Sequence, residues 1–96
     1  MREALLTIDD SPSATTGEFV AYLASRNIDA VFFCVGDRLR EFPETADLIL
    51  RSGFTIGNHS LTHPHFSQLT LPECEREIAE TERIIEAVHA RNGIER

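Results

Sequence analysis

The sequence of 96 residues contains no lysine and no tryptophan, and all nine of its basic residues are arginine. Its 16 acidic residues outnumber them and give a formal net charge of −7 at pH 7. A protein that binds the phosphate backbone of nucleic acid presents a basic face, which this composition does not offer. We therefore expect no nucleic-acid partner.

Long apolar runs are also missing, since none approaches the roughly 20 residues that a membrane-spanning helix needs. The first ten residues end in two aspartates and lack the pattern of a signal peptide. If Met1 is the true start, we expect a cytoplasmic protein without a membrane partner. The two cysteines, Cys34 and Cys74, are too few for a disulfide scaffold. Cys34 lies in an apolar run and Cys74 in a helical pattern, which predicts that both are small core residues.

Short apolar runs alternate with segments of helical periodicity along the whole chain. We predict strands at residues 4–8, 30–36 and 54–57, and helices from near Thr15 to Asn27, at 37–42, at 43–52 and from about Pro72 to Asn92. This alternation is typical of an α/β fold whose strands run parallel. The length suits one domain over residues 1–96.

Three helices carry more detailed expectations. Thr15 followed by Glu18 predicts a capping box at the start of the first helix. Spacing predicts a core-facing side for each helix. The expected core positions are Phe19, Tyr22 and Leu23 in the first helix, Ala46, Ile49 and Leu50 in the third, and Cys74, Ile78, Thr81, Ile85 and Val88 in the last.

Polar residues follow each predicted strand, where parallel α/β folds gather their binding groups. Asp9 and Asp10 end the first strand, Asp37 follows the second, and Asn58 and His59 follow the third. Adjacent carboxylates repel, and a bound cation would offset that repulsion. In the simpler alternative, one aspartate caps the turn and the other is solvated. Capping of a helix is the simplest explanation of Asp37.

His59 and His63 lie four positions apart in a histidine-rich loop at residues 58–71. That spacing brings two imidazoles within reach of one ion, on a single turn or in a compact loop. Two solvated loop histidines remain the alternative. One carboxylate with two imidazoles is a common ligand set for catalytic zinc. We expect His65 to be solvated and His89 to lie at the surface.

The motifs around these residues resemble those of one family, the polysaccharide deacetylases of carbohydrate esterase family 4. Thr7-Ile8-Asp9-Asp10-Ser11 resembles the family's Thr-Phe-Asp-Asp-Gly motif, and His59-Ser60-Leu61-Thr62-His63 resembles its His-(Ser/Thr)-x-x-His motif. The stretch between them is also similar. The resemblance implies the first half of a distorted (β/α)7, TIM-like barrel.

The resemblance also implies roles for individual residues. Asp10, His59 and His63 would bind a divalent metal, most often Zn²⁺, and Asp9 would be the catalytic general base. The implied reaction removes acetyl groups from an N-acetylated sugar polymer or oligomer, by hydrolysis of a non-peptide C–N bond. Ser11 replaces the glycine of the first motif, which predicts a strained or different backbone there.

The family's later motifs, an Arg-x-Pro segment and a histidine that protonates the leaving amine, are missing from this chain. We therefore expect that the 96 residues alone are not a complete catalyst, and that they form oligomers or lack a C-terminal half. One alternative is a fragment that binds metal without turnover. Another is a phosphoacceptor receiver-like module, but such a module needs an aspartate after its third strand and a later lysine.

Overall fold

The computed structural model describes residues 4–96. Met1, on which the expected cytoplasmic location depends, lies outside the described residues. Three strands and four α-helices alternate, with one short 3₁₀ helix between the last strand and the last α-helix. The elements are β1 Leu6–Ser11, α1 Thr16–Ser25, β2 Ala30–Cys34, α2 Gly36–Glu41, α3 Pro43–Arg51, β3 Thr55–Asn58, η1 Phe66–Gln68 and α4 Leu71–Asn92. The predicted α/β class is confirmed.

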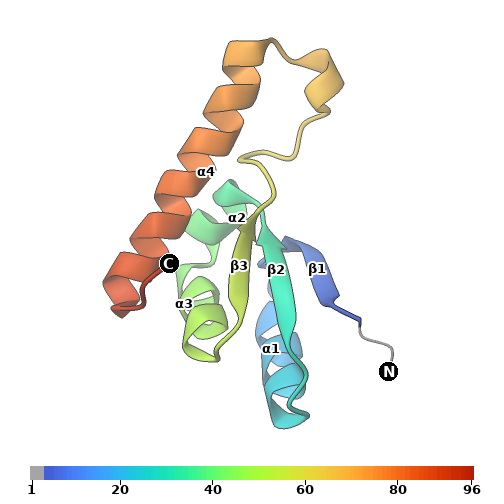
Figure 1. The fold of residues 1–96 in the computed structure, drawn as a ribbon, viewed down its shortest axis with the longest axis vertical. Helices are drawn as coiled ribbons and strands as arrows, with labels where there is room; N and C mark the ends of the chain where they lie inside the picture. The colour runs from blue at the N-terminus through green and yellow to red at the C-terminus, as the bar shows by residue number, and fades with distance from the viewer. Residues whose placement is uncertain (1–3) are drawn as a thin grey trace.

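The strands form one parallel sheet in the order β1-β2-β3. Phe32 of β2 is in register with Ile8 of β1 on one side and with Ile56 of β3 on the other. Crossovers between parallel strands are right-handed. The connection from β1 to β2 and the connection from β2 to β3 move across the sheet in the same direction, so that α1 and α3 lie on the same face. In Figure 1 all three strands end near the loop that leads into α4, whose first half projects beyond the sheet.

The core lies between that face of the sheet and the helices. Phe32 and Ile56 point into it, and the Phe32 ring meets the Phe54 ring edge to face at 5.4 Å between centroids. The helices contribute side chains that are also buried, namely Val20, Leu23, Leu39, Ala46, Ile49, Leu50, Ile85 and Val88. The core positions predicted for residues 43–52 are therefore confirmed, as is the burial of Cys34.

Several expectations about burial were wrong. Leu5 and Leu6, expected in a buried strand at 4–8, are exposed, and that strand instead runs on through Asp9 and Asp10 to Ser11. Phe19 and Tyr22 are exposed, at 59% and 50% of their surface, because α1 packs on the core through Thr16, Val20 and Leu23.

The last helix is only partly covered. Thr81, Ile85 and Val88 are buried as predicted, whereas Ile78 is exposed and Cys74 half-buried because the first half of α4 lies beyond the sheet (Figure 1). Helix periodicity identifies one face of a helix, but that face is buried only where another element packs against it.

The prediction of a capping box at Thr15 and Glu18 was also wrong. The Thr15 side chain does not cap α1. Instead, Ser13 N donates to Thr16 Oγ1, and Ser13 O accepts from Thr16 N. The reciprocal box lies at the start of α4, between Thr70 and Glu73. Across residues 4–96, no helix combines the length and the apolarity that crossing a membrane requires.

Candidate metal centre

The carboxyl ends of β1 and β3 bring three predicted site residues together. Asp10 Oδ1 lies 2.9 Å from His59 Nε2 and 3.2 Å from His63 Nε2. The two imidazole rings are 4.8 Å apart between centroids and tilted by 51°. His59 is the most enclosed of the three, while more than half of the His63 and Asp10 side chains is exposed. The group is therefore open to solvent on one side.

A β-bulge turns Asp10 toward the histidines. Asp9 is in register with Phe33 and Ser11 with Cys34, so Asp10 is the extra residue on its strand and has no partner on β2. Its φ of 63° is left-handed, a conformation that aspartate tolerates better than most residues. Such bulges commonly redirect a side chain at the edge of a sheet.

The two histidines sit on a compact loop rather than on a helix. Ser60 and His63 have φ values of 69° and 62°, each costing about 1–2 kcal/mol for a residue with a Cβ. Hydrogen bonds hold the loop in this form. His63 N donates to Ser60 Oγ over 3.0 Å, and Gly36 N at the start of α2 donates to Ser60 O over 2.8 Å.

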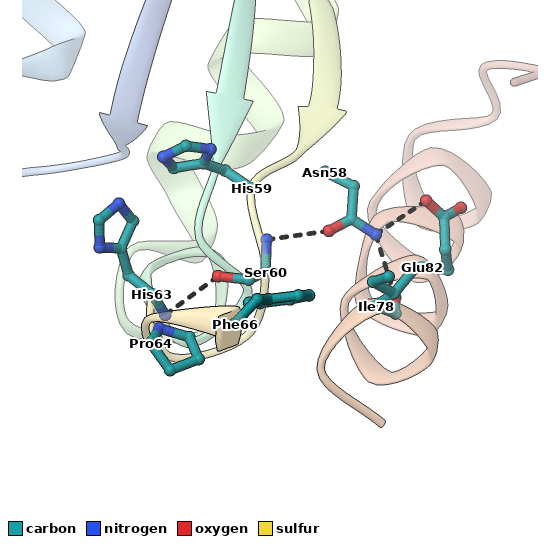
Figure 2. A pocket seen from close by; sticks show the side chains of 8 residues that line it. All are labelled: Asn58, His59, Ser60, His63, Pro64, Phe66, Ile78 and Glu82. Carbon is teal, nitrogen blue, oxygen red and sulfur yellow. Dashed lines mark hydrogen bonds between the residues drawn. The ribbon is translucent and has the colours of Figure 1, made fainter. Parts of the chain in front are cut away.

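Asn58, the last residue of β3, ties the same loop to α4. Its side-chain oxygen accepts from Ser60 N at 3.0 Å, and its amide nitrogen donates to Ile78 O and to Glu82 Oε1, as Figure 2 shows. Glu82 also pairs with Arg96. The hydrogen bond from Arg96, reinforced by that from Asn58, holds the pKa of the Glu82 carboxyl below its ordinary value. A charged Glu82 thus orients the Asn58 amide.

Two hollows flank His63. One, of about 470 Å³, lies between the loop and α4 and carries Pro64, Phe66 and Ile78 beside the two imidazoles (Figure 2). The other, of about 590 Å³, lies toward α2 and is lined by Asp10, Arg38 and other polar side chains. The three-residue group therefore opens on one side to an apolar surface and on the other to a charged one.

The spacing of the donor atoms fits a small divalent cation. All three donor atoms lie within 4.8 Å of one another. Ligands at about 2.0–2.1 Å on a tetrahedral ion are separated by about 3.3 Å, close to the two distances from Asp10 to the imidazoles. Three protein ligands leave a fourth position for water or substrate, which is the composition of catalytic rather than structural zinc sites.

The remaining candidate residues fall outside this group. Asp9 is exposed at the end of β1, next to Asp10 but not one of the three convergent donors. His65 is exposed, as predicted. His89 is half-buried instead of at the surface, with Nδ1 3.0 Å from Ile94 O. Asp37 does not cap α2, since it lies within the first turn, 3.7 Å from Arg40.

Ser11, too, differs from expectation. The left-handed conformation falls on Asp10, and Ser11 is buried with its hydroxyl 3.3 Å from the Cys34 thiol. Asn58 and Glu77 both hydrogen-bond to the histidine loop, but the sequence indicated only Asn58, as a polar residue after the third predicted strand, without its bonding role. Glu77 carried no such signal, because it is one of many glutamates on a polar helix.

Comparison with known proteins places this geometry in a family. The family model described as polysaccharide deacetylase matches residues 1–93. Peptidoglycan-N-acetylmuramic acid deacetylase PdaC of Bacillus subtilis is 38% identical over 84 residues, which are 86% of this chain and 18% of that protein. A chitooligosaccharide deacetylase of Rhizobium leguminosarum bv. trifolii is 33% identical over 85 residues, 88% of this chain and 40% of that protein.

A solved structure agrees with these relatives. The crystal structure of a peptidoglycan N-acetylglucosamine deacetylase superposes with a TM-score of 0.84 at 32% identity, over 88% of this chain and 40% of that one. The chain thus spans two fifths or less of the length of these three proteins. Its three parallel strands and their helices share the fold of part of a carbohydrate esterase family 4 deacetylase.

Proposed function

We propose a function from the premise that the chain belongs to the polysaccharide deacetylase family, whose model covers residues 1–93. The proposal is that these residues hold a divalent metal, Zn²⁺ in the first instance, and contribute the metal-binding half of a hydrolytic deacetylase site. The observation that carries it is the convergence of Asp10, His59 and His63 on one point.

The reaction we propose is hydrolysis of the acetamide of an N-acetylated amino sugar, within a chitin-like or peptidoglycan-like chain. Relatives named for peptidoglycan and for chitooligosaccharides support this class of substrate. A divalent cation at such a site polarises an amide carbonyl and lowers the pKa of water to about 7.

This chain's own residues would then divide the work. Asp10, His59 and His63 hold the ion, and Asp9, next in sequence to one ligand but outside the ligand group, accepts a proton from the attacking water. The oxygen of the water bonds to the acyl carbon and the C–N bond breaks. Acetate leaves with that oxygen, and the sugar nitrogen takes up a proton and leaves as an amine.

A cobalt titration tests the metal site. Co²⁺ at a site of two imidazoles and one carboxylate has visible absorption that reports both binding and coordination. We expect one ion to bind per chain, and His63→Ala to weaken binding by at least about tenfold because a direct ligand is lost. His65→Ala is the matched control, since His65 is exposed in the same loop and outside the ligand group. Equal affinity of all three proteins would refute the ligand set.

Acetate release from an N-acetylglucosamine oligomer tests the reaction. Asp9→Asn should abolish release and leave cobalt affinity unchanged, because Asp9 is assigned to proton transfer and not to the metal. Release that persists in Asp9→Asn would refute that role. Tight metal binding without any release by the 96-residue chain would agree with the expectation that these residues alone are not a complete catalyst, and with the alternative of a metal-binding module without turnover.

A further inference from the structure

Glu77, on α4, reaches across to the turn that joins the two histidines. Its Oε1 accepts from Leu61 N at 3.0 Å and from Thr62 N at 2.9 Å. The Thr62 hydroxyl donates to the same carboxylate, with Oε2 at 3.0 Å. Within residues 4–96, it is the one side chain that accepts from either of these two backbone amides.

The turn is therefore held from two sides. On the side of α2, the N–H groups of Gly36 and Asp37 donate to the carbonyls of Ser60 and Leu61 at 2.8 and 3.0 Å. On the side of α4, the N–H groups of Leu61 and Thr62 donate to the Glu77 carboxylate. Opposed contacts of this kind are what a backbone needs when two of its residues, Ser60 and His63, are in the left-handed conformation.

The helix backbone that carries this carboxylate is anchored at Glu77. The buried Thr81 hydroxyl donates to Glu77 O at 2.9 Å, and Thr81 packs against Gly36 at the start of α2. Glu77 thus stands where α4 is anchored, near the point at which its uncovered half begins. A group on a rigid helix positions its neighbours more closely than a group on a loop.

We propose that Glu77 is a positioning residue of the metal centre, fixing the turn at residues 60–63 so that His59 and His63 present Nε2 to one cation. The inference rests on the metal site proposed above and extends it to a residue outside the three-residue ligand group. Hydrogen bonds to an ionised carboxylate are roughly twice as strong as neutral ones, so removing Glu77 releases the turn more than loss of a neutral acceptor would.

Cobalt affinity of the folded chain provides the test. We expect Glu77→Ala to weaken Co²⁺ binding by about ten- to hundredfold, the range found when an outer partner of a metal ligand is removed. Glu77→Gln keeps an acceptor without its charge and should fall between Glu77→Ala and the wild type. Glu75→Gln is the matched control, an exposed glutamate two positions away on the same helix.

Amide hydrogen exchange, measured without metal, separates positioning from general stability. In Glu77→Gln, the Leu61 and Thr62 amides should lose protection while core amides of β2 and β3 keep theirs. Binding of Co²⁺ by the Glu77→Ala variant within about twofold of the wild type would overturn the inference. If Glu77→Ala does not fold, Glu77→Gln is judged by the same standard. A wild-type chain that binds no Co²⁺ would instead refute the metal site itself.

Discussion

Gly36 joins the core to the metal loop, and its replacement by alanine gives a prediction with a calculable size. A Cβ built on Gly36 would lie 2.7 Å from the Thr81 hydroxyl and 2.8 Å from a terminal methyl of Leu61. Both distances are below van der Waals contact. Leu61 can turn away at its flexible end, but Thr81 is fully buried and holds Glu77 O, so it can move only by breaking that bond.

Overpacking of this kind costs about 1–3 kcal/mol. Alanine recovers part of that, about 0.5–1 kcal/mol, because glycine loses more conformational freedom on folding. We therefore expect Gly36→Ala to lower the free energy of unfolding by about 1 kcal/mol, within a range of about 0–2.5 kcal/mol. In a domain of this size, each kcal/mol lowers the melting temperature by about 4–8 °C.

Thermal and urea unfolding followed by circular dichroism measures the change. Gly17→Ala is the matched control, because Gly17 lies in the first turn of α1 and its new Cβ would meet only Leu48, at an ordinary 3.8 Å. We expect that variant to be unchanged or slightly stabilised. Equal stability of the two variants would show that the contact between α2, α4 and the loop is looser than described.

Three further predictions concern α4 and the thiols. Thr70→Ala removes the capping box of α4 and should cost about 0.5–2 kcal/mol in urea unfolding, whereas Thr70→Ser should cost less. Burial raises the pKa of the Cys34 thiol to about 11, so iodoacetamide at pH 8 should label Cys74 alone in the folded chain, as mass spectrometry would show; rapid labelling of Cys34 would contradict its burial. Glu82, whose pKa is lowered chiefly by Arg96, stabilises the fold above its unfolded pKa, and this contribution is lost as the pH falls below about 4. Glu82→Gln should accordingly lose less stability than the wild type between about pH 5 and pH 3, and parallel pH profiles would refute that linkage.

The order of elements was predictable because period and punctuation agree along the chain. Pro43 begins α3, and the three core positions of that helix follow from its spacing. Burial was harder to predict, since a sequence pattern does not show whether another element covers a face. Phe19 and Ile78 occupy apolar positions that are exposed in the structure.

The candidate metal centre, too, could be predicted only in part. Two aspartates after one strand and two histidines after another predicted a shared edge of the sheet, because parallel strands end on the same side. The family resemblance then singled out Asp10, His59 and His63, which the structure brings together. The bulge at Asp10 and the left-handed Ser60 could not be predicted, since neither residue is glycine and the backbone of Ser60 is held by hydrogen bonds from other elements. The role of Glu77 could not be predicted either, because a glutamate on a polar helix is usually solvated.

The bulge in β1 makes opposing demands on a single position. For folding alone, glycine would suit position 10 better than aspartate, because its left-handed backbone is then free of steric cost and no carboxylate is brought beside a second one. A library randomised at that codon and sorted only for solubility should accumulate glycine and asparagine. The same library sorted for metal retention should return aspartate, so the difference between the two populations would measure what the centre costs the scaffold.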